Sequence, residues 1–262
     1  MCTVTLRCGA GSLLLTMNRD ERVERAPEEA PRRISGDALR PSWLAPFDGA
    51  SGGTWIGVNE RGVASCVLNG YEPADEGLRG DPSVPSRGSI IPRILEEQDG
   101  LGPARLPGGL DFSAYPSFTL LVASPEGGEI VRWRRGVGLT RENVPLGLTF
   151  LTSSSWNEPE VSLWRRRAFD AWRAAGEPET GGLPTLHLVA PAGDEATAPF
   201  MTREKSATRS ITQVRVDGSG QVASLSWWPR HGVAGIDPKN PSVSLELELA
   251  AAAAFAAEDG IA

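Results

Sequence analysis

The second residue of the chain is a cysteine, and the charged motif Asn18-Arg19-Asp20-Glu21 follows shortly after it. If Met1 is removed, Cys2 carries both a thiol nucleophile and a free α-amine. An α-amine has a pKa of about 7.7–8.0, so part of it is neutral near pH 7 and can take the thiol proton. Asp20 could accept hydrogen bonds from this amine, and the charge of Arg19 would favour the thiolate. The residues therefore indicate acyl transfer by an N-terminal cysteine.

Acyl transfer also needs hydrogen-bond donors for the oxyanion of the tetrahedral intermediate. Asn69, next to Gly70, could provide a side-chain amide and backbone N–H groups, and losing one such donor typically costs about 3 kcal/mol. Three alternatives stay open for these residues. In the first, Arg19 and Asp20 form only a solvated salt pair; in the second, Asn69-Gly70 is only a turn; in the third, Cys2 works with His231 as a dyad.

The first elements must bring Cys2 to the charged motif. Residues 2–8 alternate apolar and polar side chains, as a strand does, and residues 12–17 form a second, mostly apolar strand after the glycine turn at 9–11. In an antiparallel hairpin centred on that turn, partner numbers sum to about 20, so Cys2 faces Asn18 to within one or two residues.

The remaining pattern predicts antiparallel sheets with helices packed on them, since strands come in hairpins and not in strict alternation with helices. Residues 22–50 are rich in proline and charge and are predicted to be a long loop. A helix is predicted from Asn157, with an apolar stripe of Val161, Trp164, Ala168 and Trp172. Other strands are predicted at 54–58, 63–68, 117–123, 129–134, 148–152, 209–216 and 221–228, and other helices at 86–98 and 244–257.

Composition narrows the possible functions. The net charge of −7 over 262 residues argues against a general nucleic-acid surface. No apolar run approaches the roughly 20 residues of a membrane span. Arg7 interrupts the first apolar run, so we expect no secretory leader and a cytoplasmic location. The cysteines and histidines lack metal-ligand spacing and no nucleotide-binding motif is present, so no cofactor or metal is expected. Cys8 and Cys66 are predicted to be buried apolar residues, and the oligomeric state is left open.

Several ordered blocks resemble the NRDE family, which includes the transport and Golgi organisation protein 2. They are Asn18-Arg19-Asp20-Glu21, "GGTWIGVNERGVASCVLNG", "PSRGSIIPRIL" and "ATRSITQVRVDGSGQV". That family is similar to the N-terminal nucleophile hydrolases, in the branch with penicillin V acylase and conjugated bile acid hydrolase. The resemblance implies a single domain over residues 1–262 with an α+β fold, a four-layer αββα sandwich of two antiparallel sheets between helix layers.

The resemblance also implies roles for individual residues. Cys2 would be the nucleophile, Arg19 and Asp20 would tune and orient it, Asn69 would help to bind the oxyanion, and Arg209 would be a second cation of the site. One position departs from the pattern: in "FLTSSSW" Ser153 stands where the hydrolases have an asparagine, and a hydroxyl has a shorter reach than an amide.

Two functions follow from this comparison. The first is hydrolysis of a small, non-peptide amide by Cys2. The second is non-catalytic binding or transport of a haem-like or acyl-lipid ligand, in a pocket to which Trp55, Trp156 and Trp164 could contribute.

Overall fold

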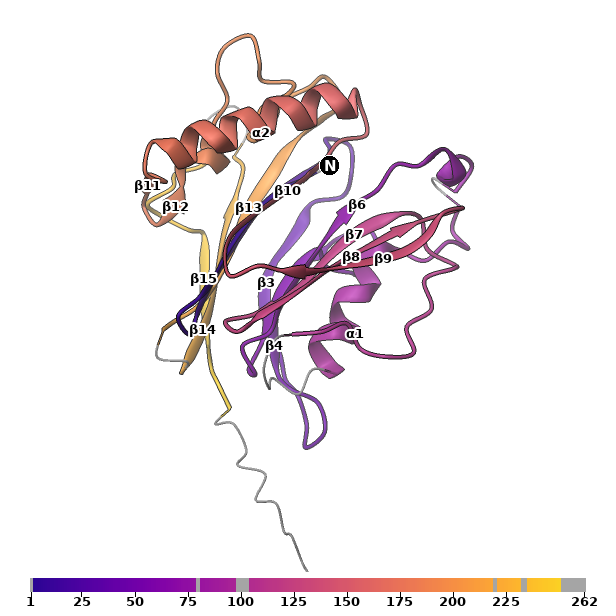
Figure 1. Ribbon diagram of the computed structural model, residues 1–262, viewed down its shortest axis with the longest axis vertical. Helices are drawn as coiled ribbons and strands as arrows, with labels where there is room; N and C mark the ends of the chain where they lie inside the picture. Colours follow the sequence, from indigo (N-terminus) through magenta and orange to yellow (C-terminus); the bar gives the residue numbers. More distant parts are fainter. Residues whose placement is uncertain (1, 79–80, 98–103, 219–220, 232–234, 251–262) are drawn as a thin grey trace, which may run out of the picture.

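Two large antiparallel sheets face each other in the computed structural model of the protein, which describes residues 2–78, 81–97, 104–218, 221–231 and 235–250 (Figure 1). The six-stranded sheet has the order β10(Gly147–Ser153), β1(Cys2–Gly9), β2(Ser12–Arg22), β13(Ser206–Val216), β14(Val222–Pro229), β15(Val243–Glu248). The seven-stranded sheet has the order β3(Glu28–Ile34), β4(Trp43–Asp48), β5(Ile56–Asn59), β6(Ala64–Asn69), β7(Phe118–Ser124), β8(Gly127–Arg134), β9(Gly138–Val144). A two-stranded pair, β11(Glu179–Thr180) and β12(Leu183–Pro184), completes the described strands.

Few helices accompany these sheets. Helix α1(Ile90–Glu97) packs against β5 and β6, and helix α2(Glu158–Ala174) packs against β10, as Figure 1 shows. Short 3₁₀ turns lie at Pro73–Asp75 (η1), Arg87–Ser89 (η2) and Thr185–Leu188 (η3). The predicted sheets with packed helices are confirmed, as is the helix at residues 86–98, which forms as η2 and α1.

The alternation of apolar side chains along the strands produces separate cores. Leu6, Leu15 and Val214 belong to the core between the two sheets, together with Cys66. A second core gathers the apolar residues of α1 and the other face of the seven-stranded sheet, and a third lies where Phe150 of β10 meets α2. Cys8 and Cys66 are buried and free, as predicted.

The first hairpin forms as predicted, with a register one residue from the expected one. Cys2 lies opposite Arg19 instead of Asn18, because the turn is the two-residue Ala10-Gly11 step between the paired residues Gly9 and Ser12. Ala10 and Gly11 both have positive φ, the conformation that matches the twist of a tight hairpin. The shift places Arg19, and not Asn18, on the same face of the sheet as Cys2.

The prediction of a long loop over residues 22–50 is wrong, because this segment contains β3 and β4. Strand β3 is an edge strand with Pro31 and four charged residues, and its pairing with β4 is irregular between Glu29 and Arg32. Proline and charge are tolerated at an edge or a bulge, although they obscure the strand pattern in the sequence. Strand β4 is buried along its whole length, so it shows no alternation either.

The predicted C-terminal helix at 244–257 is also wrong where the structure describes it. Val243–Glu248 is strand β15, in which exposed serine and glutamate alternate with leucines of the core, and it pairs with β14. Residues 251–257 lie outside the described ranges. The helix predicted from Asn157 is confirmed, but its buried face carries Arg165 and Phe169 in addition to Val161 and Trp172, so Trp164 and Ala168 lie at its border.

Candidate functional site

Cys2 lies at the start of β1, in the middle of a row of paired residues that crosses three strands. Its backbone partners are Ser153 on β10 and Arg19 on β2. Directly opposite residues of antiparallel strands point to the same face, so these three side chains are neighbours. The Cys2 side chain is buried, and burial raises the pKa of its thiol above the usual 9.0. A hydrogen bond from the Asp20 backbone and the positive charge of Arg19 lower this pKa, but burial outweighs them.

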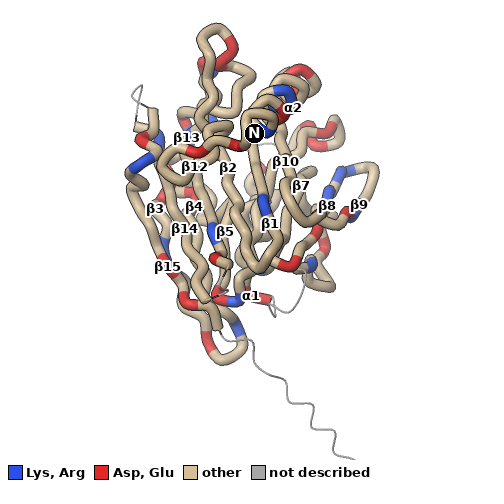
Figure 2. Tube along the Cα trace, turned by 60° about the vertical axis from the view of Figure 1, so that its left-hand side comes forward, with Lys and Arg blue, Asp and Glu red and all other residues tan. Residues whose placement is uncertain are grey.

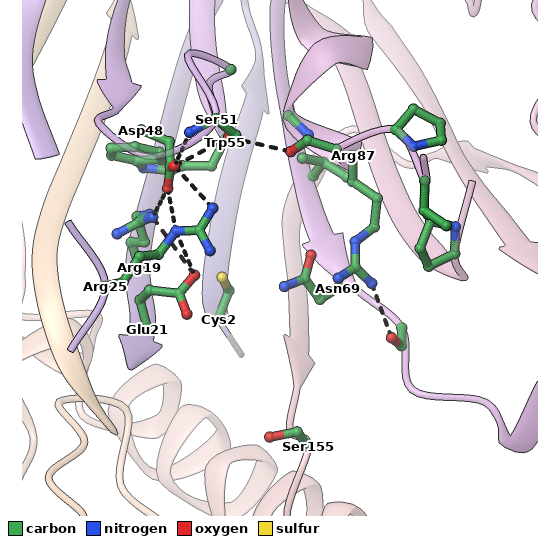
Figure 3. Close-up of a pocket in the computed structure, with 18 of the residues that line it drawn as sticks. Cys2, Arg19, Glu21, Arg25, Asp48, Ser51, Trp55, Asn69, Arg87 and Ser155 are labelled. Carbon is green, nitrogen blue, oxygen red and sulfur yellow. Dashed lines mark hydrogen bonds and ion pairs between the residues drawn. The ribbon is translucent and has the colours of Figure 1, made fainter. Parts of the chain in front are cut away.

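The guanidinium of Arg19 is fixed by carboxylates from the seven-stranded sheet. Its Nη1 donates to Oε1 of Glu28 at 2.7 Å, and its Nη2 bonds to Asp48, which lies beside it in Figure 3. Its Cζ atom lies 4.4 Å from the ring centre of Trp55. Burial works against the charge of Asp48, but hydrogen bonding to Arg25 and the charge of Arg19 outweigh it, and the pKa of this carboxyl falls to about 2. Arg19 therefore ties the two sheets together beside Cys2.

Asp20 is held by a different cation, Arg165 of α2. Both side chains are fully buried, and Arg165 Nη2 donates to Asp20 Oδ2 at 3.0 Å. Thr208 on β13 donates to the other carboxylate oxygen at 2.6 Å. These two partners, together with burial, hold the Asp20 carboxylate in one position next to the start of β1.

Arg165 also holds the backbone of Cys2 itself. Its Nη1 donates to the Cys2 carbonyl oxygen at 3.3 Å and to Thr3 Oγ1 at 2.9 Å, while its Nε donates to the Thr197 carbonyl oxygen at 3.0 Å. Thr152 on β10 donates a further hydrogen bond to the same Cys2 oxygen at 3.0 Å. One buried arginine therefore connects α2 with both Cys2 and Asp20.

A cavity of about 460 Å³ opens beside this cluster. Cys2, Arg19, Asp20 and Asn69 all line it, so the structure brings four of the six predicted site residues together. Asn69 ends β6 and stands across the cavity from Cys2 in Figure 3. The other lining residues come mainly from segments 48–55 and 70–88, and they include Asp48, Trp55, Tyr71, Arg87 and Gly88, together with Arg25 from the turn after β2.

The position of Asn69 is fixed through the residue that follows it. Gly70 N–H donates to the Ser117 carbonyl oxygen at 2.8 Å, and Arg87 Nη1 donates to the carbonyl oxygens of Gly70 and Ser117 at 3.2 and 3.0 Å. A Cβ at position 70 would lie 2.8 Å from the Ser117 backbone, so only glycine permits this approach. Asn69-Gly70 is consequently a strand end anchored to β7.

The other two predicted residues are not part of the cavity lining. Ser153 pairs with Cys2, and its Oγ is buried without a hydrogen-bond partner, while Ser155 of the same segment lines the cavity. Arg209 lies at the irregularity in the pairing of β13 with β2, and its Nη1 donates to the carbonyl oxygens of Arg22 and Val23 at 3.0 and 3.2 Å. Arg209 thus supports the turn after β2, and the structure does not bring it to the cavity.

Asn18, the first residue of the charged motif, points to the opposite side of the sheet. Its Nδ2 donates to the carbonyl oxygens of His187 and Pro199 at 2.9 Å each, and its Oδ1 bonds to His187 Nδ1. His187 Nε2 is 2.7 Å from Thr5 Oγ1, and burial lowers the pKa of this histidine to about 3. The other histidine, His231, is exposed and does not line the cavity.

Sequence reasoning missed Arg165 and Asp48. Asp48 ends a segment that was expected to be a loop. Arg165 is one of three consecutive arginines in a helix, and only the interruption of the apolar stripe at this position could have marked it. Within the described ranges, no group of three or more His, Cys, Asp or Glu residues could hold a metal ion. No described helix is both long and apolar enough to cross a membrane.

Comparisons with known proteins give a family match and similarities of fold. Residues 1–166 match the profile of the family described as Transport and Golgi organisation 2, while no curated protein matches the sequence. The N-acylethanolamine-hydrolyzing acid amidase (NAAA) ortholog of Caenorhabditis elegans is 12% identical, with a TM-score of 0.53 over 81% of this chain and 92% of that chain.

Two further solved structures show lower similarity. Penicillin V acylase from Agrobacterium tumefaciens is 11% identical, with a TM-score of 0.44 over 97% of this chain and 93% of that chain. A mutant conjugated bile acid hydrolase from Clostridium perfringens is 10% identical, with a TM-score of 0.43 over 95% of this chain and 92% of that chain. The likeness to the worm protein shows the fold alone: an N-terminal-nucleophile-hydrolase-like fold with two large antiparallel sheets and few helices.

Proposed function

The chain belongs to the Transport and Golgi organisation 2 family, and we propose that it is an N-terminal cysteine amidohydrolase that acts on a small amide. The observation that carries this proposal is the joint presence of Cys2, Arg19, Asp20 and Asn69 around one cavity of about 460 Å³. A cavity of that size suits a small molecule. The two sheets and the helices on them would then correspond to a four-layer αββα sandwich.

The proposed reaction begins when removal of Met1 frees the α-amine of Cys2. The neutral amine accepts the thiol proton, and Sγ attacks the carbonyl carbon of the amide to form a tetrahedral intermediate. The C–N bond then breaks, and the leaving amine takes the proton from the α-ammonium group. Water, deprotonated by the same amine, attacks the thioester, which releases the acid and restores the Cys2 thiol.

The surrounding residues have distinct roles in this proposal. Asp20, fixed by Arg165 and Thr208, orients the α-amine and stabilises its charged form. Arg165 holds the Cys2 carbonyl, so that the thiol and the amine keep one position relative to the cavity. The Asn69 side-chain amide donates to the oxyanion from across the cavity. The unpartnered Ser153 Oγ, next to Cys2, is the second donor we propose for this oxyanion.

The test uses protein expressed without an N-terminal tag. Its intact mass should show loss of Met1, and it should hydrolyse an N-acylethanolamine, the class named for the similar worm protein. Cys2→Ala should abolish turnover, while Cys8→Ala should leave it unchanged, because Cys8 does not line the cavity. Retention of Met1 on essentially every molecule would exclude the mechanism in that form.

A second function, non-catalytic binding or transport of a haem-like or acyl-lipid ligand, is favoured by two observations. Burial raises the pKa of the Cys2 thiol, which opposes formation of the nucleophile, and Ser153 offers a hydroxyl where an amide would reach further. Trp55 of the cavity wall would contact such a ligand. Fluorescence titration with haemin or a fatty-acyl ester separates the two functions. If the protein is a carrier, Cys2→Ala binds the ligand with the same affinity as the wild type, and the wild type does not turn the ligand over.

A further inference from the structure

A second cavity of about 270 Å³ lies between the edge strand β10, strands β7 and β8, and helix α2. It shares no lining residue with the cavity around Cys2. Arg132 and Arg134 of β8 and Arg166 of α2 line it, and we call it the arginine cleft. Whereas the first cavity contains several carboxylates, no aspartate or glutamate is among the described residues that line the arginine cleft. Basic residues on β8 and on α2 are visible in Figure 2.

The two arginines of β8 keep donors for a ligand. They are two residues apart on one strand, so they point to the same face of the sheet. Arg132 Nη1 donates to Glu142 at 2.7 Å, and Arg134 Nη1 bonds to Glu72. Each guanidinium has five N–H donors, so most of its donors are not used by these ion pairs. Exposed ion pairs of this kind are weak, and a multivalent anion can compete with them.

The third arginine is oriented by aromatic rings instead of by a carboxylate. The guanidinium of Arg166 lies 4.6 Å from the ring centre of Phe150 and 5.3 Å from that of Phe169. Among the described residues no acidic side chain pairs with it. Stacking holds the plane of a guanidinium and leaves its N–H groups directed outward, which is the geometry used to bind oxyanions.

Hydroxyl groups complete the lining of the arginine cleft. Thr119 stands directly opposite Arg132 in the β7–β8 pair, and no hydrogen bond of its side chain is found within the described ranges. Ser162 of α2 and Thr152 of β10 also line the cleft, but their hydroxyls already donate to Glu158 at 2.6 Å and to the Cys2 carbonyl oxygen at 3.0 Å. The Thr119 hydroxyl is therefore the one available to a ligand. A hydroxyl together with arginines is a typical set of donors to phosphate oxygens, whereas a carboxylate has only two oxygens to share among three guanidinium groups.

We propose that the arginine cleft binds a phosphate group, as inorganic phosphate or as the phosphomonoester of a small metabolite. Arg132 and Arg134 contact the phosphate from β8, and Arg166 contacts it from α2. Because Thr152 lines the cleft and also donates to the Cys2 carbonyl, the bound phosphate lies one side chain away from the backbone of Cys2. This site is independent of any reaction at Cys2.

The test is isothermal titration calorimetry of the full chain with inorganic phosphate, glycerol 3-phosphate and acetate at constant ionic strength. We expect a Kd below about 1 mM for at least one phosphate ligand and no measurable binding of acetate. Arg166→Gln should weaken phosphate binding by about tenfold or more, since hydrogen bonds to charged groups are the strong ones. Thr119→Val, a change that conserves volume, should weaken it by a smaller factor.

Arg167→Gln is the matched control, because Arg167 is the next residue of α2, is exposed and does not line the arginine cleft. It removes the same charge and should leave the Kd within about twofold. Binding by glycerol 3-phosphate alone would identify the ligand as a phosphomonoester. The proposal is overturned if neither phosphate ligand binds, if acetate binds as tightly, or if Arg167→Gln weakens binding as much as Arg166→Gln.

Discussion

The strongest structural prediction concerns Arg165, the buried arginine that connects α2 with Cys2 and Asp20. Arg165→Met conserves much of the side-chain volume but leaves the Asp20 carboxylate buried without its cation. Removing one partner of a buried ion pair typically costs about 3–5 kcal/mol. The Cys2, Thr3 and Thr197 oxygens lose donors as well, so we place the loss in the free energy of unfolding at the upper end of that range.

Urea denaturation of wild type and variants measures this loss. Arg166→Met, one residue further along the same helix, removes an exposed arginine and should change the free energy of unfolding by less than about 1 kcal/mol. The double variant Asp20→Asn/Arg165→Met should lose less stability than Arg165→Met alone, because no unpaired charge remains. A loss below about 1 kcal/mol for Arg165→Met, or strict additivity with Asp20→Asn, would refute the assigned role.

Three further predictions concern pH, reactivity and packing. His187 has a pKa of about 3 in the folded protein, below its ordinary value of 6.5. Its contribution to the free energy of unfolding is therefore complete above pH 6.5 and declines as the pH falls toward 3. Urea denaturation at pH 5 should show a loss of about 2 kcal/mol in this free energy that is absent in His187→Gln. Alkylation of Cys2 by iodoacetamide should still be accelerating above pH 9, its ordinary pKa, and a rate that levels off below pH 8 would contradict the burial argument. Gly53→Ala should cost about 1–3 kcal/mol by denaturation, because its Cβ would lie 2.7 Å from the Gly88 backbone, whereas Gly108→Ala meets no atom within 4 Å and should be neutral.

The sequence was sufficient to predict the local parts of the site. The glycine turn and the alternation of residues 2–8 define the first hairpin, and they bring Cys2 to the charged motif with an error of one residue in register. Asn69 was placed correctly at a strand end, because Gly70 marks it. These features depend on contacts between residues close in sequence, which patterns record well.

Long-range features could not be predicted in the same way. Strand β3 contains Pro31 and several charges because it is an edge strand, and only the complete sheet shows where the edge is. Arg165 interrupts the apolar face of α2, and its burial makes sense only once Asp20 is known to face it. The family resemblance suggested Arg209 as the second cation near Cys2, but in this chain its guanidinium bonds to the carbonyls of the turn after β2.

Trapping the acyl form of Cys2 shows whether this residue is an N-terminal nucleophile. Untagged protein is mixed with p-nitrophenyl butyrate, quenched in acid within the first turnover and digested with trypsin. A nucleophilic Cys2 should give a butyryl group on the peptide of residues 2–7, with Met1 absent and Cys8 and Cys66 unmodified. A peptide that retains Met1, or butyryl groups spread equally over the three cysteines, would contradict it.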